Sequence, residues 1–73
     1  MTLANLQIGT VAKVKNVIGD NAVSKRLMEM GIVPGVLVRV IKAAPFGDPI
    51  EIRVRGYNLA MRRNEAEAIE IDE

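Results

Sequence analysis

Residues 26–35 read Arg-Leu-Met-Glu-Met-Gly-Ile-Val-Pro-Gly, a stretch that predicts where a helix stops and a strand begins. Gly31 suits the left-handed residue that commonly ends a helix, and Ile32 suits the apolar position that follows it. Pro34 cannot continue a helix, and Pro34 followed by Gly35 fits the two central positions of a type II turn. We therefore expect a helix before Gly31 and a strand after the turn.

The helix itself is predicted from an apolar stripe. Val23, Leu27 and Met30 recur at helical spacing, so their side chains share one face, which we expect to pack in the core. Asp20 or Asn21 can accept hydrogen bonds from the free backbone N–H groups of the first turn. The helix is therefore expected to begin at one of these two residues.

Short pieces of chain on both sides of the helix are predicted to be strands, because Gly and Pro interrupt the sequence frequently. In Ile50–Arg55 the alternation is cleanest, with apolar residues inward and Glu51, Arg53 and Arg55 facing water. The other expected strands are Gly9–Val17, Val36–Lys42 and Ala68–Ile71. The imperfect alternation in Gly9–Val17 indicates a bulge or burial on both faces. A short segment, Asn58–Arg62, leads to a turn near Asn64.

Several short strands with Gly and Pro turns and a single helix predict a mainly β fold. We expect a small SH3-like β-barrel with one inserted α-helix, because closing the sheet hides the edges of its strands. A ferredoxin-like fold fits less well, since only one helix is convincing. All 73 residues are expected to form one domain, residues 1–73. A chain of this size buries only about 60% of its unfolded surface, which disfavours a deep substrate cleft.

Composition restricts how the domain is stabilised. Hydrophobic residues make up 49% of the chain, and there is no cysteine and no histidine. Disulfides and ordinary zinc sites are therefore excluded, so stability must come from an apolar core or from self-association, and weak homo-oligomerisation stays open. No apolar run approaches the ~18 residues that span a bilayer, and Met1–Thr10 lacks the pattern of a signal peptide. We expect a cytoplasmic protein without direct membrane insertion.

The sequence lacks the residues that most catalytic sites use. Without His or Cys there is neither the usual general base nor a thiol nucleophile, and no Gly-rich loop with Lys and Ser or Thr is present to hold phosphates. We therefore expect no enzyme activity, no catalytic residue, no cofactor and no small-molecule substrate. The C-terminal carboxylates match no ordered calcium loop, so we interpret them as a solvated acidic tail, with a weak site for a hard cation as the alternative: Glu65, Glu67, Glu70, Asp72 and Glu73.

Charge is distributed unevenly along the chain. Residues 1–63 carry ten Lys and Arg against four acids, whereas residues 64–73 carry five acids and no base. A basic body with an acidic tail is typical of proteins with anionic partners, although the same charges also keep a small domain soluble.

Five arginines could form a basic patch across neighbouring strands: Arg39, Arg53, Arg55, Arg62 and Arg63. Arg53 and Arg55 are two apart on one expected strand and should project from the same side, with Arg39 on the next strand. Leu37 and Ile41 share the face of Arg39, which we expect to be half covered. Such guanidinium groups suit carboxylates on a protein partner, and we predict that Arg39, Arg53 and Arg55 bind it. Solvation, or pairing with nearby acids, is the alternative interpretation.

Nucleic acid is the less favoured partner of this patch. Small barrels that bind single strands commonly stack bases on aromatic side chains. Tyr57 is the only aromatic residue near the patch, and Phe46 is expected in a loop.

Four groups of residues occur in order along the chain: Leu3-x-x-Leu6-x-x-Gly9; Arg26-Leu27-x-x-Met30-Gly31-Ile32-x-Pro34-Gly35; Ala44-Pro45-x-Gly47-Asp48-Pro49-Ile50; and Tyr57-x-Leu59-Ala60-x-Arg62 followed by Glu65-Ala66 and Ile69. Together they resemble the FeoA domain over residues 3–71, although each motif alone is weak. Met61 departs conservatively from the Leu that the family often has at this position.

The resemblance implies an SH3-like barrel and a cytoplasmic accessory role in iron homeostasis beside FeoB, a membrane ferrous-iron transporter with a GTP-binding domain. The partner implied is the cytoplasmic part of a FeoB-type transporter, which the domain would modulate. The same domain type forms the C-terminal part of iron-dependent repressors. A free-standing regulatory domain of that kind, or a nucleic-acid-binding small barrel, is therefore the alternative.

Overall fold

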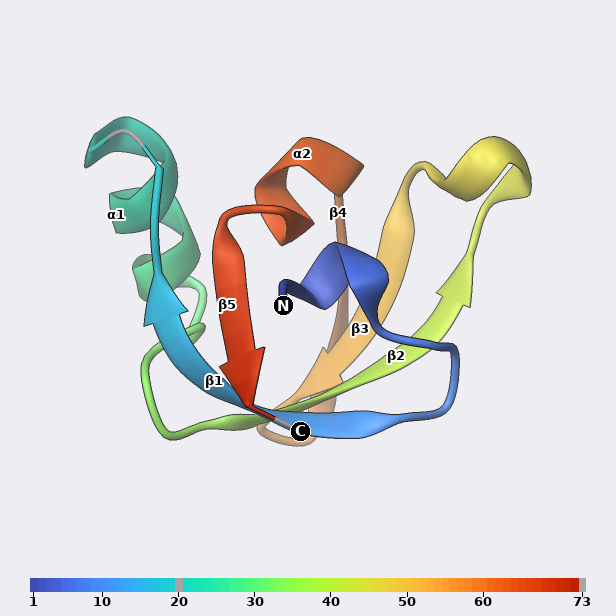
Figure 1. Cartoon of the computed structure of the whole chain (residues 1–73), viewed down its shortest axis with the longest axis horizontal. Helices are drawn as coiled ribbons and strands as arrows, with labels where there is room; N and C mark the ends of the chain where they lie inside the picture. Colours follow the sequence, from blue (N-terminus) through green and yellow to red (C-terminus); the bar gives the residue numbers. More distant parts are fainter. Residues whose placement is uncertain (20, 73) are drawn as a thin grey trace.

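The computed structural model describes residues 1–19 and 21–72, of which Asn21 is described by its backbone alone (Figure 1). Within this part of the chain the elements are five strands, two α-helices and two short 3-10 turns. They are η1 (Leu3–Asn5), β1 (Val11–Val17), α1 (Asn21–Glu29), β2 (Leu37–Ala43), η2 (Pro45–Gly47), β3 (Ile50–Val54), β4 (Tyr57–Met61), α2 (Arg63–Ala66) and β5 (Ile69–Asp72). The predicted mainly β fold with one longer helix is confirmed, whereas the single-turn helix α2 was not predicted.

The strands form one antiparallel sheet in the order β4-β3-β2-β1-β5. The predicted closure of the sheet into a barrel is wrong, because β4 and β5 lie at its two edges and do not pair within the described residues. The sheet instead curls into an open cup, with η1 and α2 in its mouth and α1 along one side (Figure 1). The edge of β5 is covered by the N-terminus, since Thr2 bridges Glu70 and the Ile71 N–H donates to the Met1 carbonyl at 3.1 Å.

The end of α1 has the geometry that the sequence predicts. Gly31 has φ +95°, its N–H donates to the Met28 carbonyl at 3.0 Å, and the Ile32 N–H donates to the Leu27 carbonyl at 3.0 Å. These two hydrogen bonds define a Schellman motif, in which the residue after the glycine packs on the last turn of the helix. The expected cap at the start of α1, by the side chain of Asp20 or Asn21, lies outside the described residues.

The turn after α1 is also confirmed. Gly35 has φ +95°, and the Val36 N–H donates to the Val33 carbonyl at 3.2 Å, as a type II turn requires. The expected irregularity in β1 is a bulge between Val14 and Asn16, where β1 pairs with β5. The turn is joined to β1, since the Gly35 N–H donates to the Val14 carbonyl and the Val14 N–H donates to the Val36 carbonyl, both at 2.8 Å.

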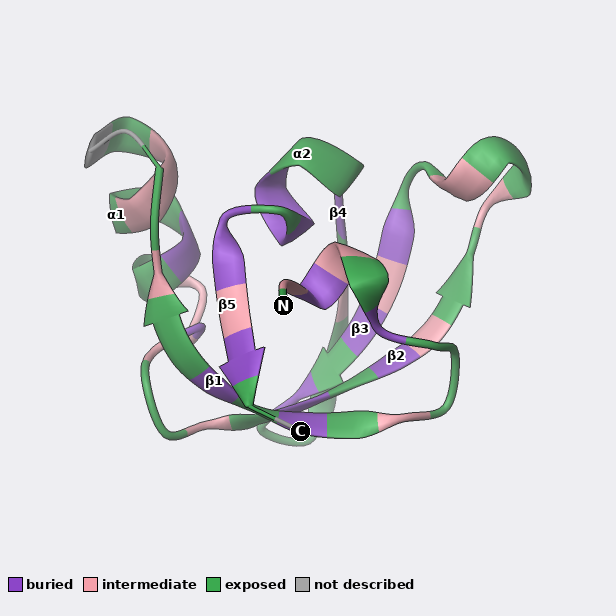
Figure 2. Cartoon of the chain, in the orientation of Figure 1, coloured by how far each residue is buried: buried purple, intermediate pink, exposed green. Residues whose placement is uncertain are grey.

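The core fills the cup between the sheet, α1 and η1 (Figure 2). Apolar side chains alternate inward along β3, as predicted. Leu3 of η1 and Leu27 of α1 are completely buried with Ile32, so the helices supply the apolar groups that cover the open side of the sheet. The most completely buried large side chains are Leu3, Leu27, Ile32, Ile52, Ile69, Val14, Val38 and Val54.

We expect Leu27→Ala to lower the free energy of unfolding by roughly 2–5 kcal/mol, because the change removes a fully buried side chain and leaves a cavity. Met28→Ala, at the neighbouring exposed position, is the matched control and should change stability by no more than about 0.5 kcal/mol. Denaturant melts of both variants measure the difference. Equal losses would show that α1 does not cover the core through Leu27.

Candidate functional site: the outer face of the sheet

The outer face of the sheet is the surface that β1, β2 and β3 turn away from the core. On this face Arg39 of β2 lies directly opposite Arg53 of β3, and Val11 of β1 lies opposite Arg39 on the other side. Both arginines are exposed. The structure thus brings together two of the three predicted partner-binding residues, as neighbours on adjacent strands.

Arg53 is fixed in position by the hairpin that follows it. Its Nη1 donates to Oδ1 of Asn58 at 3.1 Å, and its Nη2 donates to the Gly56 carbonyl at 3.2 Å. Asn58 in turn donates through Nδ2 to Oε2 of Glu51 at 3.2 Å. A guanidinium group held in this way loses less rotamer freedom when it binds an anionic group.

The predicted placement of Arg55 is wrong. Strand β3 ends at Val54, and Arg55 (φ +53°) and Gly56 (φ +85°) form a two-residue turn that pairs Val54 with Tyr57. Positive φ at both central residues is the signature of a type I′ hairpin turn, which matches the twist of the strands. Arg55 therefore does not lie parallel to Arg53 on one strand.

The side chain of Arg55 instead runs toward the end of α1. Its Cδ lies 3.5 Å from the position that a Cβ on Gly31 would occupy, and the side chain lines a shallow hollow with Pro34 and Leu37. The hydroxyl of Tyr57, the residue that completes the hairpin, donates a hydrogen bond to the Met30 carbonyl. The hairpin is therefore joined to the helix end.

Two apolar residues of the outer face were not predicted as part of the site. Leu37 of β2 is 58% exposed and Val11 of β1 is 41% exposed, whereas Ile41 is half-buried, so this face of β2 is partly covered, as expected. Lys13 lies opposite Leu37 on β1. The signal that could have found them is a large apolar residue on the strand face that points to water. With the arginines they make a surface that suits an acidic protein partner with apolar side chains of its own.

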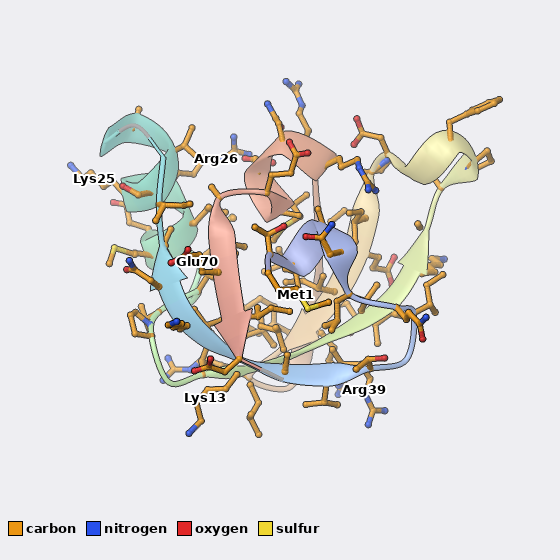
Figure 3. All side chains as sticks on the ribbon, viewed as in Figure 1. Met1, Lys13, Lys25, Arg26, Arg39 and Glu70 are labelled. Carbon is orange, nitrogen blue, oxygen red and sulfur yellow. The ribbon has the colours of Figure 1, made fainter. Side chains whose placement is uncertain are left out.

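The cations of the domain are divided between two regions of the molecule. Lys13 and Arg39 project from the bottom of the view in Figure 3, whereas Lys25 and Arg26 belong to α1 at the upper left. Arg63 follows β4 at the start of α2, where its backbone N–H donates to Oδ1 of Asp48 at 3.0 Å. The predicted five-arginine patch is therefore divided between the outer face and the helices.

The expected solvated acidic tail is wrong for Glu65, which is 7% exposed. Its Oε1 accepts a hydrogen bond from the Arg62 N–H at 2.9 Å, and its Oε2 lies 3.1 Å from Nη1 of Arg26. The carboxylate thus caps the first turn of α2 and ties it to α1. Residues 1–19 and 21–72 contain no group of three or more His, Cys, Asp or Glu that could hold a metal ion.

We expect Glu65→Ala to lower the free energy of unfolding by roughly 1–2 kcal/mol, the cost of losing a helix cap. Glu65→Gln keeps an acceptor for the Arg62 N–H and loses only the ion pair to the exposed Arg26, so its loss should stay below about 1 kcal/mol. Glu67→Ala is the exposed control. Thermal and denaturant melts of the three variants test the expected order of stability losses, which is largest for Glu65→Ala. Equal losses at positions 65 and 67 would contradict it.

Comparison with known proteins places this geometry in one family. The family model for the FeoA domain matches residues 1–73. A fusion protein of Porphyromonas gingivalis, Fe(2+) transport protein A joined to the Fe(2+) transporter FeoB, is 38% identical over 72 residues. That match covers 99% of this chain but only 8% of the fusion protein.

Two solved structures have the same fold. The FeoA protein of Chlorobium tepidum superposes with a TM-score of 0.89 at 46% identity, covering 97% of this chain and 68% of that protein. A zinc complex of FeoA from Stenotrophomonas maltophilia gives a TM-score of 0.88 at 34% identity, covering 99% and 89% of the two chains. That protein is described as a prokaryotic SH3-domain protein and was put forward as an activating factor of ferrous iron transport.

Proposed function

This chain belongs to the FeoA family, which is linked to ferrous iron transport, and from this premise we propose that it is a non-catalytic accessory protein of iron uptake. It binds the cytoplasmic part of a FeoB-type transporter and modulates its activity. The site of action is the cytoplasm, at the membrane that holds the transporter. No helix in the described residues is long and apolar enough to cross a membrane.

The observation that carries this proposal is the fused relative. A domain 38% identical to this chain is covalently joined to the transporter FeoB in Porphyromonas gingivalis. Fusion raises the effective concentration of a domain beside its partner, so it favours pairs of proteins that work in contact. If this chain works in contact with the transporter, it needs a surface that can bind a protein.

The outer face supplies that surface. Arg39 and Arg53 offer two guanidinium groups side by side, and Arg53 is held by Asn58 and the Gly56 carbonyl. Leu37 and Val11 add exposed apolar area next to them. We therefore assign binding of the transporter to this face, with carboxylates of the partner on the two arginines. Arg55 contributes at the rim, from the turn beside Leu37.

We expect the double variant Arg39→Glu with Arg53→Glu to abolish capture of the cytoplasmic part of the cognate FeoB transporter. The fold should survive, because the two residues are exposed and the change replaces one pair of like charges with another. Capture by the unmodified protein should weaken with added salt, since exposed charges are screened. Pull-downs over a salt series, with melts as the folding check, measure both effects.

The matched control is Lys25→Glu with Arg62→Glu, which makes the same change in net charge on exposed residues outside the outer face. It should leave capture unchanged. If it abolishes capture while the outer-face variant does not, the interface lies on the helices. Strong, salt-sensitive binding of oligonucleotides by the unmodified protein would instead favour the nucleic-acid alternative.

We also expect no GTP hydrolysis by the isolated chain, because the sequence contains no His, no Cys and no phosphate-binding loop. Phosphate release from the purified protein should equal that of buffer. Turnover that scales with protein concentration and disappears on changing one exposed residue of this chain would overturn the non-catalytic assignment.

A further inference from the structure

The loop between β2 and β3 presents an aromatic side chain entirely to water. Phe46 is 104% exposed, whereas every other large apolar side chain of the described residues keeps at least a third of its surface covered. Its backbone has φ +69°, a conformation that aromatic residues rarely adopt. Backbone strain of this kind persists only where the surrounding structure imposes it, and it clusters at functional positions.

The loop is held firmly enough to impose that strain. The Gly47 N–H donates to the Ala44 carbonyl at 2.8 Å, and the Ala44 N–H donates to the Pro49 carbonyl at 2.9 Å. Asp48 fastens the loop to α2 by accepting the Arg63 N–H at 3.0 Å. The backbone at Phe46 is thus held by hydrogen bonds on both sides, and its side chain projects from the loop as an aromatic knob.

A hollow of about 340 Å³ lies at the base of the same loop. Small and apolar side chains line most of it: Ala43, Ala44, Pro45, Pro49 and Ala60. A phenyl ring fits a hollow of this volume. Phe46 itself does not occupy it, because a side chain packed there would not be fully exposed.

Knob and hollow therefore belong to the same loop, since Pro45, the neighbour of Phe46, lines the hollow. A two-fold axis midway between them would place Phe46 of each copy over the hollow of the other, which is the self-complementary arrangement of an isologous dimer. The rim of the hollow carries Lys42 and Glu51, whose Nζ and Oε1 are 3.9 Å apart. The charges of this pair cancel, so two such rims brought together carry no net charge from it.

We propose that this chain forms a weak two-fold dimer in which Phe46 of each copy enters the hollow beside the β2–β3 loop of the other. A second copy of the chain is the occupant that fits, since the chain carries both halves of the contact. One ring and one shallow hollow per copy bury far less than the ~1,200 Å² of a stable interface. The dimer should therefore form only at high concentration, with a Kd on the order of 1 mM.

Two variants remove the two halves of the contact separately. Phe46→Asn deletes the knob and places a residue that tolerates positive φ in the loop, so the fold should be kept. Ala60→Lys blocks the hollow at an exposed position of β4. Leu37→Asn removes another large exposed apolar side chain, from the outer face, and serves as the control.

Sedimentation velocity over a concentration series should show a monomer–dimer equilibrium for the unmodified chain and for Leu37→Asn. Phe46→Asn and Ala60→Lys should each remain monomeric. Mixing these two variants should restore weak association, because the knob of one still fits the hollow of the other. In a sample mixed from differently labelled copies, nuclear Overhauser contacts should join the Phe46 ring to the methyl group of Ala60.

Several results would overturn the dimer. The unmodified chain could stay monomeric at millimolar concentration, or Phe46→Asn could dimerise as well as the unmodified chain. Loss of association in Leu37→Asn would place the interface on the outer face. Resonances of Phe46 that shift only on addition of anionic lipid vesicles, or of the transporter's cytoplasmic part, would assign the knob to that occupant instead of a second copy.

Discussion

The fold depends on sealing the open side of a curled sheet. Because β4 and β5 do not pair, the interior would meet water between them, and no disulfide closes it. The seal is made by Leu3, Leu27 and Ile32, all fully buried. Leu27 and Ile32 are linked directly, since the Ile32 N–H donates to the Leu27 carbonyl. One left-handed residue, Gly31, therefore sets both the end of α1 and the position of two core side chains.

This seal decides which surfaces remain for binding. The open side of the sheet is occupied by α1, α2 and η1. The exposed Arg26 of α1 pairs with Glu65 of α2 and so joins the two helices. The side of the sheet that carries no helix is the outer face, where cations and apolar residues stay exposed. On this face the short β3–β4 turn orients Arg53, which donates to the Gly56 carbonyl and to the adjoining Asn58. The proposed partner surface is thus shaped by hairpin geometry.

The sequence predicts well those features that local chemistry determines. The cap at Gly31, the turn at Gly35 and the alternation in β3 follow from residue type and spacing alone. Arg55 was misplaced because alternation continues through it, while the twist of a two-residue hairpin places it in the turn. Glu65 was misjudged because its environment depends on contacts distant in sequence, since α2 packs against η1 and Glu65 pairs with Arg26 of α1. The open sheet was missed because pairing of edge strands depends on how the helices fill the gap.

The two proposed binding surfaces lie on the same pair of strands but face different directions. Arg39 and Arg53 lie in the regular part of the β2–β3 pair, and Phe46 lies in the loop that joins the same strands. A bulge between Val40 and Lys42 separates them, and bulges bend a strand and increase its twist. The loop therefore rises beside α2, while the outer face points to the opposite side of the sheet (Figure 1). A domain of 73 residues can in this way contact a transporter and a second copy of itself together, because neither contact requires the other surface to move.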